Sequence, residues 1–155
     1  MKNTCGIYLY DITSRKILLV HPTNHAPDFW SIPKGINDEG EAVMDAAIRE
    51  LKEETNIDLL KLQLHPKVCE FNPIQYKKKH KTLCTILVGV EVPHMGVLKC
   101  ESYFELKGRQ IPECDNWWWA SLDEAKKVLH ETQVSQLGIV REFADHTFHL
   151  GHSAE

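Results

Sequence analysis

The chain has 155 residues, of which 43% are hydrophobic and 26% are charged, and its formal net charge is −4. This is the composition of an ordinary globular protein, and the length suits one domain around one core. The apolar content is too high and the net charge too small for a disordered chain. The acidic balance argues against a protein that coats nucleic acid, because such a protein needs a basic surface.

Neither a membrane segment nor a secretion signal is expected. The longest apolar runs, 17–20 and 83–90, are far too short to span a bilayer, and the first residues contain no small-residue cleavage site. The cysteines are odd in number and form no C-x-x-C pair, which predicts buried, reduced thiols in a cytoplasmic protein. They are Cys5, Cys69, Cys84, Cys100 and Cys114.

The first elements are expected to be a hairpin, a helix and two strands. Two β-rich runs, 5–10 and 16–21, are separated by the turn-like sequence DITSR. Residues 41–55 have the pattern of a helix. Strands are then expected at 68–72 and at 82–92, and the second of these is predicted to be central in the sheet.

The last elements are expected to be one short strand and two helices. The strand covers 117–120, and Ser121 with Glu124 forms a capping box that starts a helix reaching about residue 130. A final helix is predicted at 135–144. The tail, about 145–155, is expected to be frayed. Strands followed by mixed strands and helices indicate an α+β or α/β chain with a mixed sheet, and we favour α+β.

One edge of the helix predicted at 41–55 concentrates acidic residues. On a helix, Glu50, Glu53 and Glu54 fall within about 100° of each other. Like charges at this spacing oppose helix formation by about 0.2–0.5 kcal/mol per pair. Taken alone, the stripe is typical of a solvated helix face, but a bound divalent cation would offset its repulsion. Residues 38–58 carry a net charge of −6 and the rest of the chain +2, so the acidity is concentrated there.

The residues around the stripe decide between these alternatives. Gly35 is followed after five residues by Glu41, and seven residues later comes RELKEE (49–54), with Ile57 after it. This spacing resembles the Nudix hydrolase family, whose box is G-x5-E-x7-R-E-U-x-E-E-x-G-U, with U apolar. The second glycine of the box is Asn56 here. Asparagine is the best residue other than glycine for the left-handed conformation expected at this helix end.

The resemblance implies a Nudix fold, an α/β/α sandwich around a mixed β-sheet, over a single domain of residues 1–155. It also implies hydrolysis of a nucleoside diphosphate linked to another group, with Mg²⁺ or Mn²⁺. By the same resemblance, Glu50 and Glu54 would be direct metal ligands. Glu53 would lie close to the metal, and the Gly35 carbonyl would be a further ligand.

The resemblance also implies catalytic roles for four residues. Arg49 would orient a glutamate through charge-assisted hydrogen bonds, and Glu41 would pair with Arg49 to hold the loop. The general base stays open between Glu53 and Glu113. We favour Glu53 as the base and Glu113 for positioning metal or water.

Three features outside the box bear on the substrate. The sequence WSIPKG, which contains Lys34, resembles the W-x-x-P-K-G of diadenosine polyphosphate hydrolases, diphosphoinositol phosphatases and decapping enzymes. By this resemblance Lys34 would reach substrate phosphates, and the alternative is a surface lysine in a turn. The run YKKKHK is either a solvated hairpin loop or a grip on polyphosphate, with Tyr76 stacking on a base and Lys77 and Lys79 at phosphates. Of three consecutive tryptophans, the first and third share a strand face. Trp117 is the candidate to clamp a nucleobase.

The preferred prediction is asymmetric cleavage of a dinucleoside polyphosphate such as diadenosine tetraphosphate. Within the family, the alternatives are removal of an RNA 5′-polyphosphate or cap, and cleavage of diphosphoinositol polyphosphates, nucleoside triphosphates or ADP-ribose. A non-catalytic module that binds a nucleotide is the alternative from another class. The expected partners are a small nucleotide substrate or an RNA 5′ end, without membrane contacts, and the expected state is a monomer or homodimer.

Overall fold

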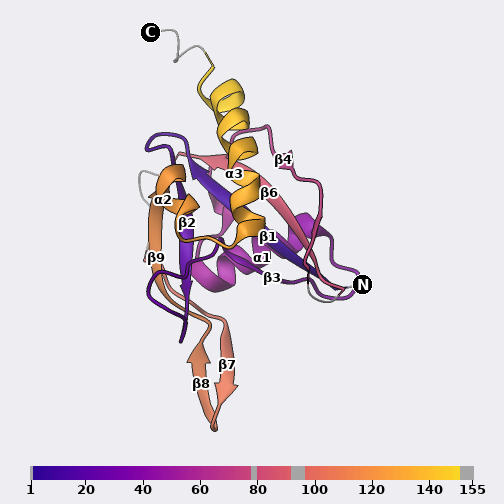
Figure 1. Cartoon of the computed structure of the whole chain (residues 1–155), viewed down its shortest axis with the longest axis vertical. Coiled ribbons are helices and arrows are strands. Elements are labelled where there is room, and N and C mark those ends of the chain that lie inside the picture. Colours follow the sequence, from indigo (N-terminus) through magenta and orange to yellow (C-terminus); the bar gives the residue numbers. More distant parts are fainter. Residues whose placement is uncertain (1, 78–79, 92–96, 151–155) are drawn as a thin grey trace.

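A mixed β-sheet with helices on both faces forms the body of the protein (Figure 1). The computed structural model describes residues 2–77, 80–91 and 97–150. The main sheet has the strand order β4-β6-β1-β2-β9, with β3 beside β1 and β5 beside β6. Its strands are β1 (Asn3–Asp11), β2 (Lys16–Pro22), β3 (Lys34–Ile36), β4 (Cys69–Glu70), β5 (Ile74–Gln75), β6 (Thr82–Val90) and β9 (Cys114–Ser121). The α-helices are α1 (Val43–Thr55), α2 (Leu122–Lys126) and α3 (Glu131–Phe143), and a 3-10 turn covers Leu59–Lys61.

Strand β1 occupies the middle of the sheet. It pairs with β2 through the predicted hairpin, and it runs parallel to β6 from Asn3 beside Thr82 to Asp11 beside Val90. Nearly all of β1 is buried, as is usual for a strand with both faces covered. The strand predicted at 82–92 therefore lies inside the sheet, but next to the middle position. It ends at Val90, and its last predicted residue lies outside the described residues.

The two faces of the sheet belong to different hydrophobic clusters. Leu9 of β1 shares one cluster with Leu51 of α1. Tyr8 of β1 points to the opposite face and shares another cluster with Leu137 of α3. Successive side chains of a strand alternate between faces, so one strand contributes to both clusters. The α+β class and the α/β/α sandwich expected from the sequence are confirmed.

Several predicted elements have different bounds in the structure. The strand expected at 68–72 is reduced to β4, whereas the strand expected at 117–120 extends over all of β9. The capping box of Ser121 and Glu124 is confirmed, with both reciprocal hydrogen bonds present. Its helix ends at Lys126, so the prediction of a helix reaching residue 130 was too long.

The final helix starts earlier than predicted. It was expected at 135–144, but α3 begins at Glu131 because the His130 side chain accepts the backbone N–H of Thr132 and caps the helix. A helix N-terminus leaves unpaired N–H groups, and a side-chain acceptor at this position satisfies one of them. The capping histidine therefore adds one turn to the predicted helix.

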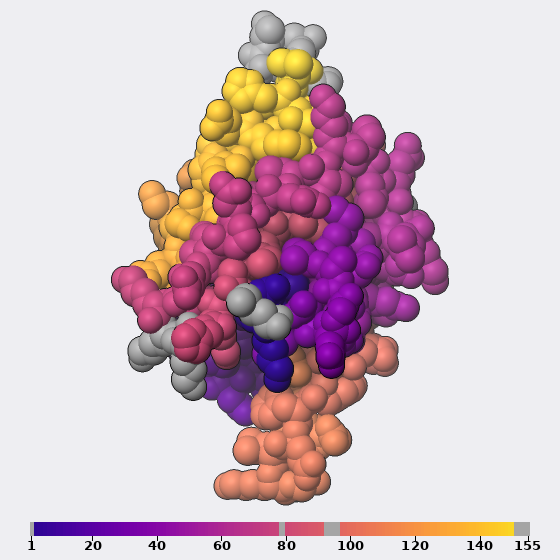
Figure 2. Space-filling model, turned by 90° about the vertical axis from the view of Figure 1, so that its right-hand side faces the viewer, coloured from indigo at the N-terminus to yellow at the C-terminus, as the bar shows by residue number. Residues whose placement is uncertain are grey.

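A second, small sheet was not predicted. It consists of β7 (Tyr103–Leu106) and β8 (Arg109–Pro112), which form an antiparallel hairpin. Its turn residues Lys107 and Gly108 have φ values of 51° and 76°, the left-handed values that a tight two-residue hairpin turn requires. Figures 1 and 2 show this hairpin projecting from the body at the end opposite the C-terminus.

The C-terminal segment is ordered further than expected. Fraying was expected from about residue 145, but a π-helical turn (Ala144–Phe148) continues α3. The Phe148 ring stacks on Tyr10 with ring centroids 5.6 Å apart. His149 is buried, and its Nε2 lies 3.0 Å from the Tyr10 hydroxyl. Tertiary contacts with β1 therefore hold a segment that lacks a strong local signal.

The hydrophobicity of the helices and the state of the cysteines follow from the structure. In the part of the chain that the structure describes, no helix has both the length and the hydrophobicity to cross a membrane. All five cysteines are free, and four of them are buried. The prediction of mostly buried, unpaired thiols is confirmed.

Replacing Phe148 with alanine should reduce the free energy of unfolding by about 3 kcal/mol, because the ring leaves a cavity against β1 and β6. Urea denaturation followed by circular dichroism measures the change. His146→Ala is the control, since His146 is exposed on the same turn and should change stability by less than about 0.5 kcal/mol. Equal changes in the free energy of unfolding for the two substitutions would show that the C-terminal segment does not pack on β1 and β6.

Candidate active site

Helix α1 carries the acidic stripe, and its end is formed as predicted. Asn56 closes the last turn with a φ of 68° and donates its backbone N–H to the Lys52 carbonyl. Asparagine tolerates this left-handed conformation better than other residues with a side chain. The motif therefore keeps its helix end although glycine is absent from this position.

The Arg49 guanidinium joins the loop before α1 to the helix itself. It donates two hydrogen bonds of 2.9 Å to Glu41, and its Nη1 donates to Glu50 at 3.0 Å and to Glu53 at 3.1 Å. A further N–H donates to the Ile36 carbonyl at 3.2 Å. The bonds from Arg49, with one from a backbone N–H, lower the pKa of Glu41 to about 2. The predicted pairing of Arg49 with Glu41 and with box glutamates is confirmed.

Two carboxylates of the stripe are buried. Glu50 is 7% exposed and Glu54 is 5% exposed. Burial and neighbouring carboxylates raise the pKa of Glu50 to about 7, and the same two causes raise the pKa of Glu54. Glu54 accepts the backbone N–H of Lys34 at 3.1 Å. The positive charge around these two carboxylates is too small to offset their burial.

Gly35 lies directly against the Glu50 carboxyl group. It belongs to β3, where it pairs with Cys5 of β1. A Cβ atom at this position would overlap the Glu50 carboxyl. Glycine is therefore required here for space, and it brings the main chain of β3 beside the buried carboxylates.

These residues fit an open site for a hard cation. In the described part of the chain, no three histidine, cysteine, aspartate or glutamate side chains converge as a complete metal cage. Glu53 turns instead to Arg49. Glu50 and Glu54 remain, one helical turn apart and buried, with the Gly35 main chain beside them. Oxygen donors with a surplus of negative charge suit a divalent cation that keeps several waters.

A cavity of about 320 Å³ opens beside the buried carboxylates. Glu54, Lys34 and Glu113 line it. The charge of Glu113 contributes to the raised pKa of both Glu50 and Glu54, so Glu113 faces the same site. The structure thus brings Glu113, which directly precedes β9, to the acidic stripe of α1.

A larger cavity of about 900 Å³ adjoins the first, and Lys34, Tyr76 and His130 line both. Lys77 and Lys81 line the larger cavity. The Tyr76 backbone N–H donates to the Lys81 carbonyl at 2.9 Å, so the basic run closes the hairpin between β5 and β6. The two interpretations of this run are therefore compatible, because the hairpin loop also borders a cavity.

The Trp117 side chain, a predicted substrate contact, bonds to the end of helix α1. The Trp117 indole N–H donates to the Glu54 carbonyl at 2.8 Å, which supports the end of α1. Trp117 and Trp119 pack on the α1 side of the sheet and Trp118 on the other, as strand geometry predicts. A contact of Trp117 with substrate stays a prediction, and Lys79 lies outside the described residues.

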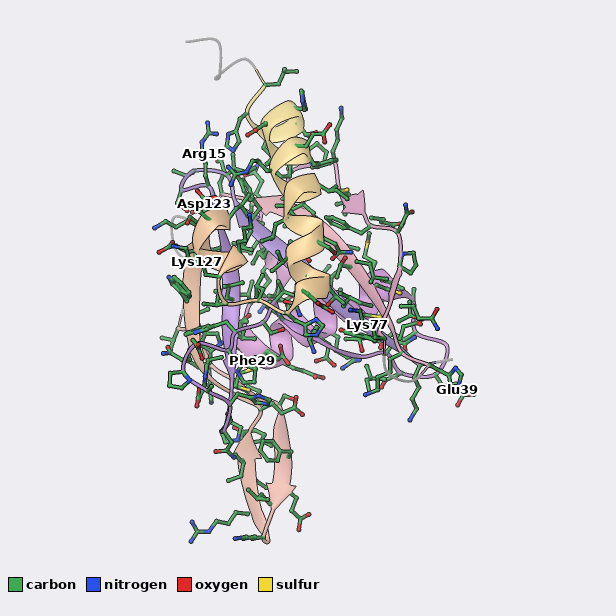
Figure 3. The ribbon with its side chains drawn as sticks, viewed as in Figure 1. Arg15, Phe29, Glu39, Lys77, Asp123 and Lys127 are labelled. Carbon is green, nitrogen blue, oxygen red and sulfur yellow. The ribbon has the colours of Figure 1, made fainter. Side chains whose placement is uncertain are left out.

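Sequence reasoning named Tyr76 but missed His25, Phe29 and His130 in the cavity walls. His25 and Phe29 stack with centroids 4.8 Å apart and line the smaller cavity. His130 meets Tyr76 edge-on at 6.0 Å where the cavities join. In Figure 3, Phe29 and Lys77 lie at the same end of the sandwich, near the start of α3. The only signal in the sequence was the presence of aromatic residues in loops. This signal does not indicate which of the rings contact each other.

The NUDIX domain model matches residues 2–143. The chain belongs to the Nudix family. A bis(5′-nucleosyl)-tetraphosphatase (asymmetrical) of Caenorhabditis elegans is 30% identical over 133 residues, which cover 85% of this chain and 88% of that protein. The crystal structure of a C. elegans Ap4A hydrolase binary complex has a TM-score of 0.67 at 29% identity, over 90% of this chain and 96% of that one.

More distant structures share the fold. The ORF135 protein of E. coli has a TM-score of 0.64 at 18% identity, over 95% of this chain and 93% of that one. The family match and the 30% identical relative make the protein a Nudix hydrolase. Enzymes of this family act on small nucleotide substrates and generally use divalent metals.

Substituting Gly35 with alanine should abolish most hydrolysis, because the new methyl group displaces the Glu50 carboxyl. Steady-state hydrolysis with Mg²⁺ is expected to fall by about 100-fold or more. Gly138→Ala is the matched control, since nothing lies within contact distance of its added methyl group. In helix α3 that control should gain about 1 kcal/mol of stability and keep full activity. Normal activity of the Gly35→Ala protein would contradict the placement of Glu50.

The Glu50→Gln substitution should raise the stability of the protein and lower its activity. Because the pKa of Glu50 rises from 4.5 to about 7 on folding, ionisation of this group destabilises the fold progressively from about pH 4.5 to above pH 7. The substitution should therefore stabilise the metal-free protein by about 3 kcal/mol at pH 8 and hardly at pH 4.5. Thermal unfolding in EDTA at several pH values measures this. Hydrolysis with Mg²⁺ should fall by about 100-fold or more, and unchanged hydrolysis would contradict the site.

Proposed function

We propose that this Nudix hydrolase cleaves dinucleoside polyphosphates asymmetrically and that diadenosine tetraphosphate is a substrate. The observation that carries the proposal is the pair of adjoining cavities that share Lys34. His25 and Phe29 stand in the smaller cavity, and Tyr76 with His130 stands at the junction. A molecule with a base at each end and phosphates between them matches this order of aromatic and cationic groups. The similarity to a bis(5′-nucleosyl)-tetraphosphatase supports the same choice.

The lysine side chains that line the two cavities favour a substrate with a long phosphate chain over one with a short chain. Lys34 borders both cavities, and Lys77 and Lys81 border the larger one. Lysines along one groove attract successive phosphates, and each added phosphate gains a further contact. Lys77 also pairs with Glu131 at 3.6 Å, but both side chains are exposed and such pairs are weak, so a phosphate can replace Glu131. ADP-ribose, with two phosphates, would use less of this surface.

We propose that Glu50, Glu54 and the Gly35 carbonyl hold Mg²⁺ or Mn²⁺. When bound, such a cation would neutralise phosphate charge and acidify a coordinated water. Arg49 keeps Glu50 and Glu53 in place through its hydrogen bonds. Glu53, which is half-buried, would take the proton of the attacking water as the general base. Glu113, which also lines the smaller cavity, would orient water.

A non-catalytic module is the less favoured alternative, because the chain retains every carboxylate of the box and buries two of them at a cost in stability. The structure offers no reason for this burial in a module that only binds a nucleotide. We also propose a cytoplasmic location, since free, mostly buried cysteines suit a reducing compartment.

A substrate panel with product identification tests the proposal. The purified protein is incubated with Mg²⁺ and diadenosine tetraphosphate, triphosphorylated or capped RNA, nucleoside triphosphates, ADP-ribose or diphosphoinositol polyphosphates. Release of ATP and AMP from diadenosine tetraphosphate, at the highest kcat/KM of the panel, is the expected result. Rapid turnover of ADP-ribose alone would contradict the proposal.

The role of the basic run is tested in the same assay. Lys77→Ala should raise KM for diadenosine tetraphosphate about fivefold and change kcat little, because it removes one phosphate contact. Lys127→Ala is the control, since this exposed lysine lies on the α2 side of the molecule, away from Lys77 (Figure 3). Equal KM values for the two proteins would show that phosphates do not reach Lys77.

A further inference from the structure

His21, near the end of β2, contacts two segments that line the smaller cavity. Its Nδ1 lies 2.6 Å from the Asp115 carboxylate, and its Nε2 lies 2.9 Å from the Ala26 carbonyl oxygen. The residue is 9% exposed, and its ring packs edge-on against Trp30 with centroids 5.3 Å apart. His21 lies outside the Nudix box and does not line either cavity, so the proposed hydrolysis gives it no direct role.

Both partners of the His21 ring are hydrogen-bond acceptors. A carboxylate and a carbonyl can only accept, whereas a neutral imidazole has a single donor nitrogen. Both hydrogen bonds therefore exist together only when the ring carries two protons. Burial lowers the pKa of His21, but the bonds to Ala26 and Asp115 outweigh this effect and place the pKa above its ordinary value.

The two acceptors belong to two different segments that contribute to the lining of the smaller cavity. Ala26 lies in the loop that carries His25 and Phe29, the stacked aromatic pair. Asp115 lies two residues after Glu113, which lines the same cavity. His21 thus connects the aromatic wall to the segment that carries Glu113.

We infer that the His21 imidazolium is a positioning group that holds the loop of residues 23–29 against the Glu113 segment and so shapes the nucleobase end of the cavity. The inference rests on the proposed function, because that function places a nucleobase at this loop. When the ring loses a proton, its one remaining N–H stays with the Asp115 carboxylate, the stronger acceptor, and the bond to Ala26 is lost. The backbone bond of 2.9 Å from the Thr23 N–H to the Glu113 carbonyl and the pairing of β2 with β9 then still join the two segments, but the loop around Ala26 loses its bond to the His21 ring.

The charged surroundings of the ring determine the direction of its pH dependence. Segments 22–30 and 113–116 pack against His21, and their titratable side chains are His25, Asp28, Glu113, Cys114 and Asp115. The carboxylates among them favour the doubly protonated ring. Since the pKa of His21 is raised on folding, its support of the loop is complete at low pH and is lost as the pH rises through the raised pKa. KM for the nucleotide should therefore increase on the alkaline side, and kcat should change less.

The protonation state can be measured without any substrate. In protein labelled with ¹⁵N-histidine, the chemical shifts of the His21 ring should show both nitrogens protonated at pH 7. Proton loss should occur at a pH above the ordinary pKa of a histidine side chain. Asp115→Asn should lower the pH of that transition, because it keeps the shape of the partner and removes its charge. A neutral His21 ring at pH 7 in the wild-type protein would overturn the inference.

Kinetics then test the positioning role with the nucleotide that gives the highest turnover in the panel. Asp115→Asn should raise KM about tenfold at pH 7, with kcat within about twofold of wild type. Asp123→Asn is the matched control, since it removes a surface ion pair with Arg141 and should leave both constants unchanged. If the Asp115→Asn protein had the same KM as the wild type across the pH range, the inference would be overturned. A different preferred nucleotide would contradict only the proposed substrate, whereas unchanged KM values would contradict only the role of His21. The two failures are therefore distinguishable.

Discussion

The charge of Arg49 is the constraint on which the catalytic half of the molecule depends. Helix α1 and the loop before it carry carboxylates that would repel each other if the guanidinium were absent. Arg49 bonds to Glu41 in the loop and to Glu50 and Glu53 on the helix, so one planar cation fixes the relative position of both segments. A lysine could not do this, because it lacks the fork of donors that reaches several carboxylates at once.

Arg49 does not neutralise the whole stripe. Glu54 lies outside its reach, and Glu50 remains buried with a raised pKa in spite of its bond to Arg49. The fold therefore holds an excess of negative charge in a place where burial is costly. Such a local conflict with stability is typical of functional sites. Nudix hydrolases generally use divalent metals, and a divalent cation held by these carboxylates would offset the excess of negative charge.

The remaining parts of the site come from segments far apart in the sequence. The loop after β2 contributes His25 and Phe29, the hairpin loop between β5 and β6 contributes Tyr76, and the start of α3 contributes His130. These loops meet because β2, β5 and β6 belong to one sheet, in which only β1 lies between β2 and β6, and because α3 crosses its face (Figure 1). Variation of such loops can change the nucleotide that is bound while the acidic helix keeps the chemistry.

The sequence by itself determined features that depend on short spacing. Helix α1, the hairpin of β1 and β2, the capping box and the left-handed Asn56 follow from local patterns, and the acidic stripe follows from helical geometry. Tertiary structure alone decided which distant groups meet. It paired His21 with Asp115 across 94 residues and packed the tail on β1, while the β7–β8 hairpin, with its weak local signal, became apparent only in the fold. The physical reason is that hydrogen bonds and burial depend on distance in space, and a single sequence records only distance along the chain.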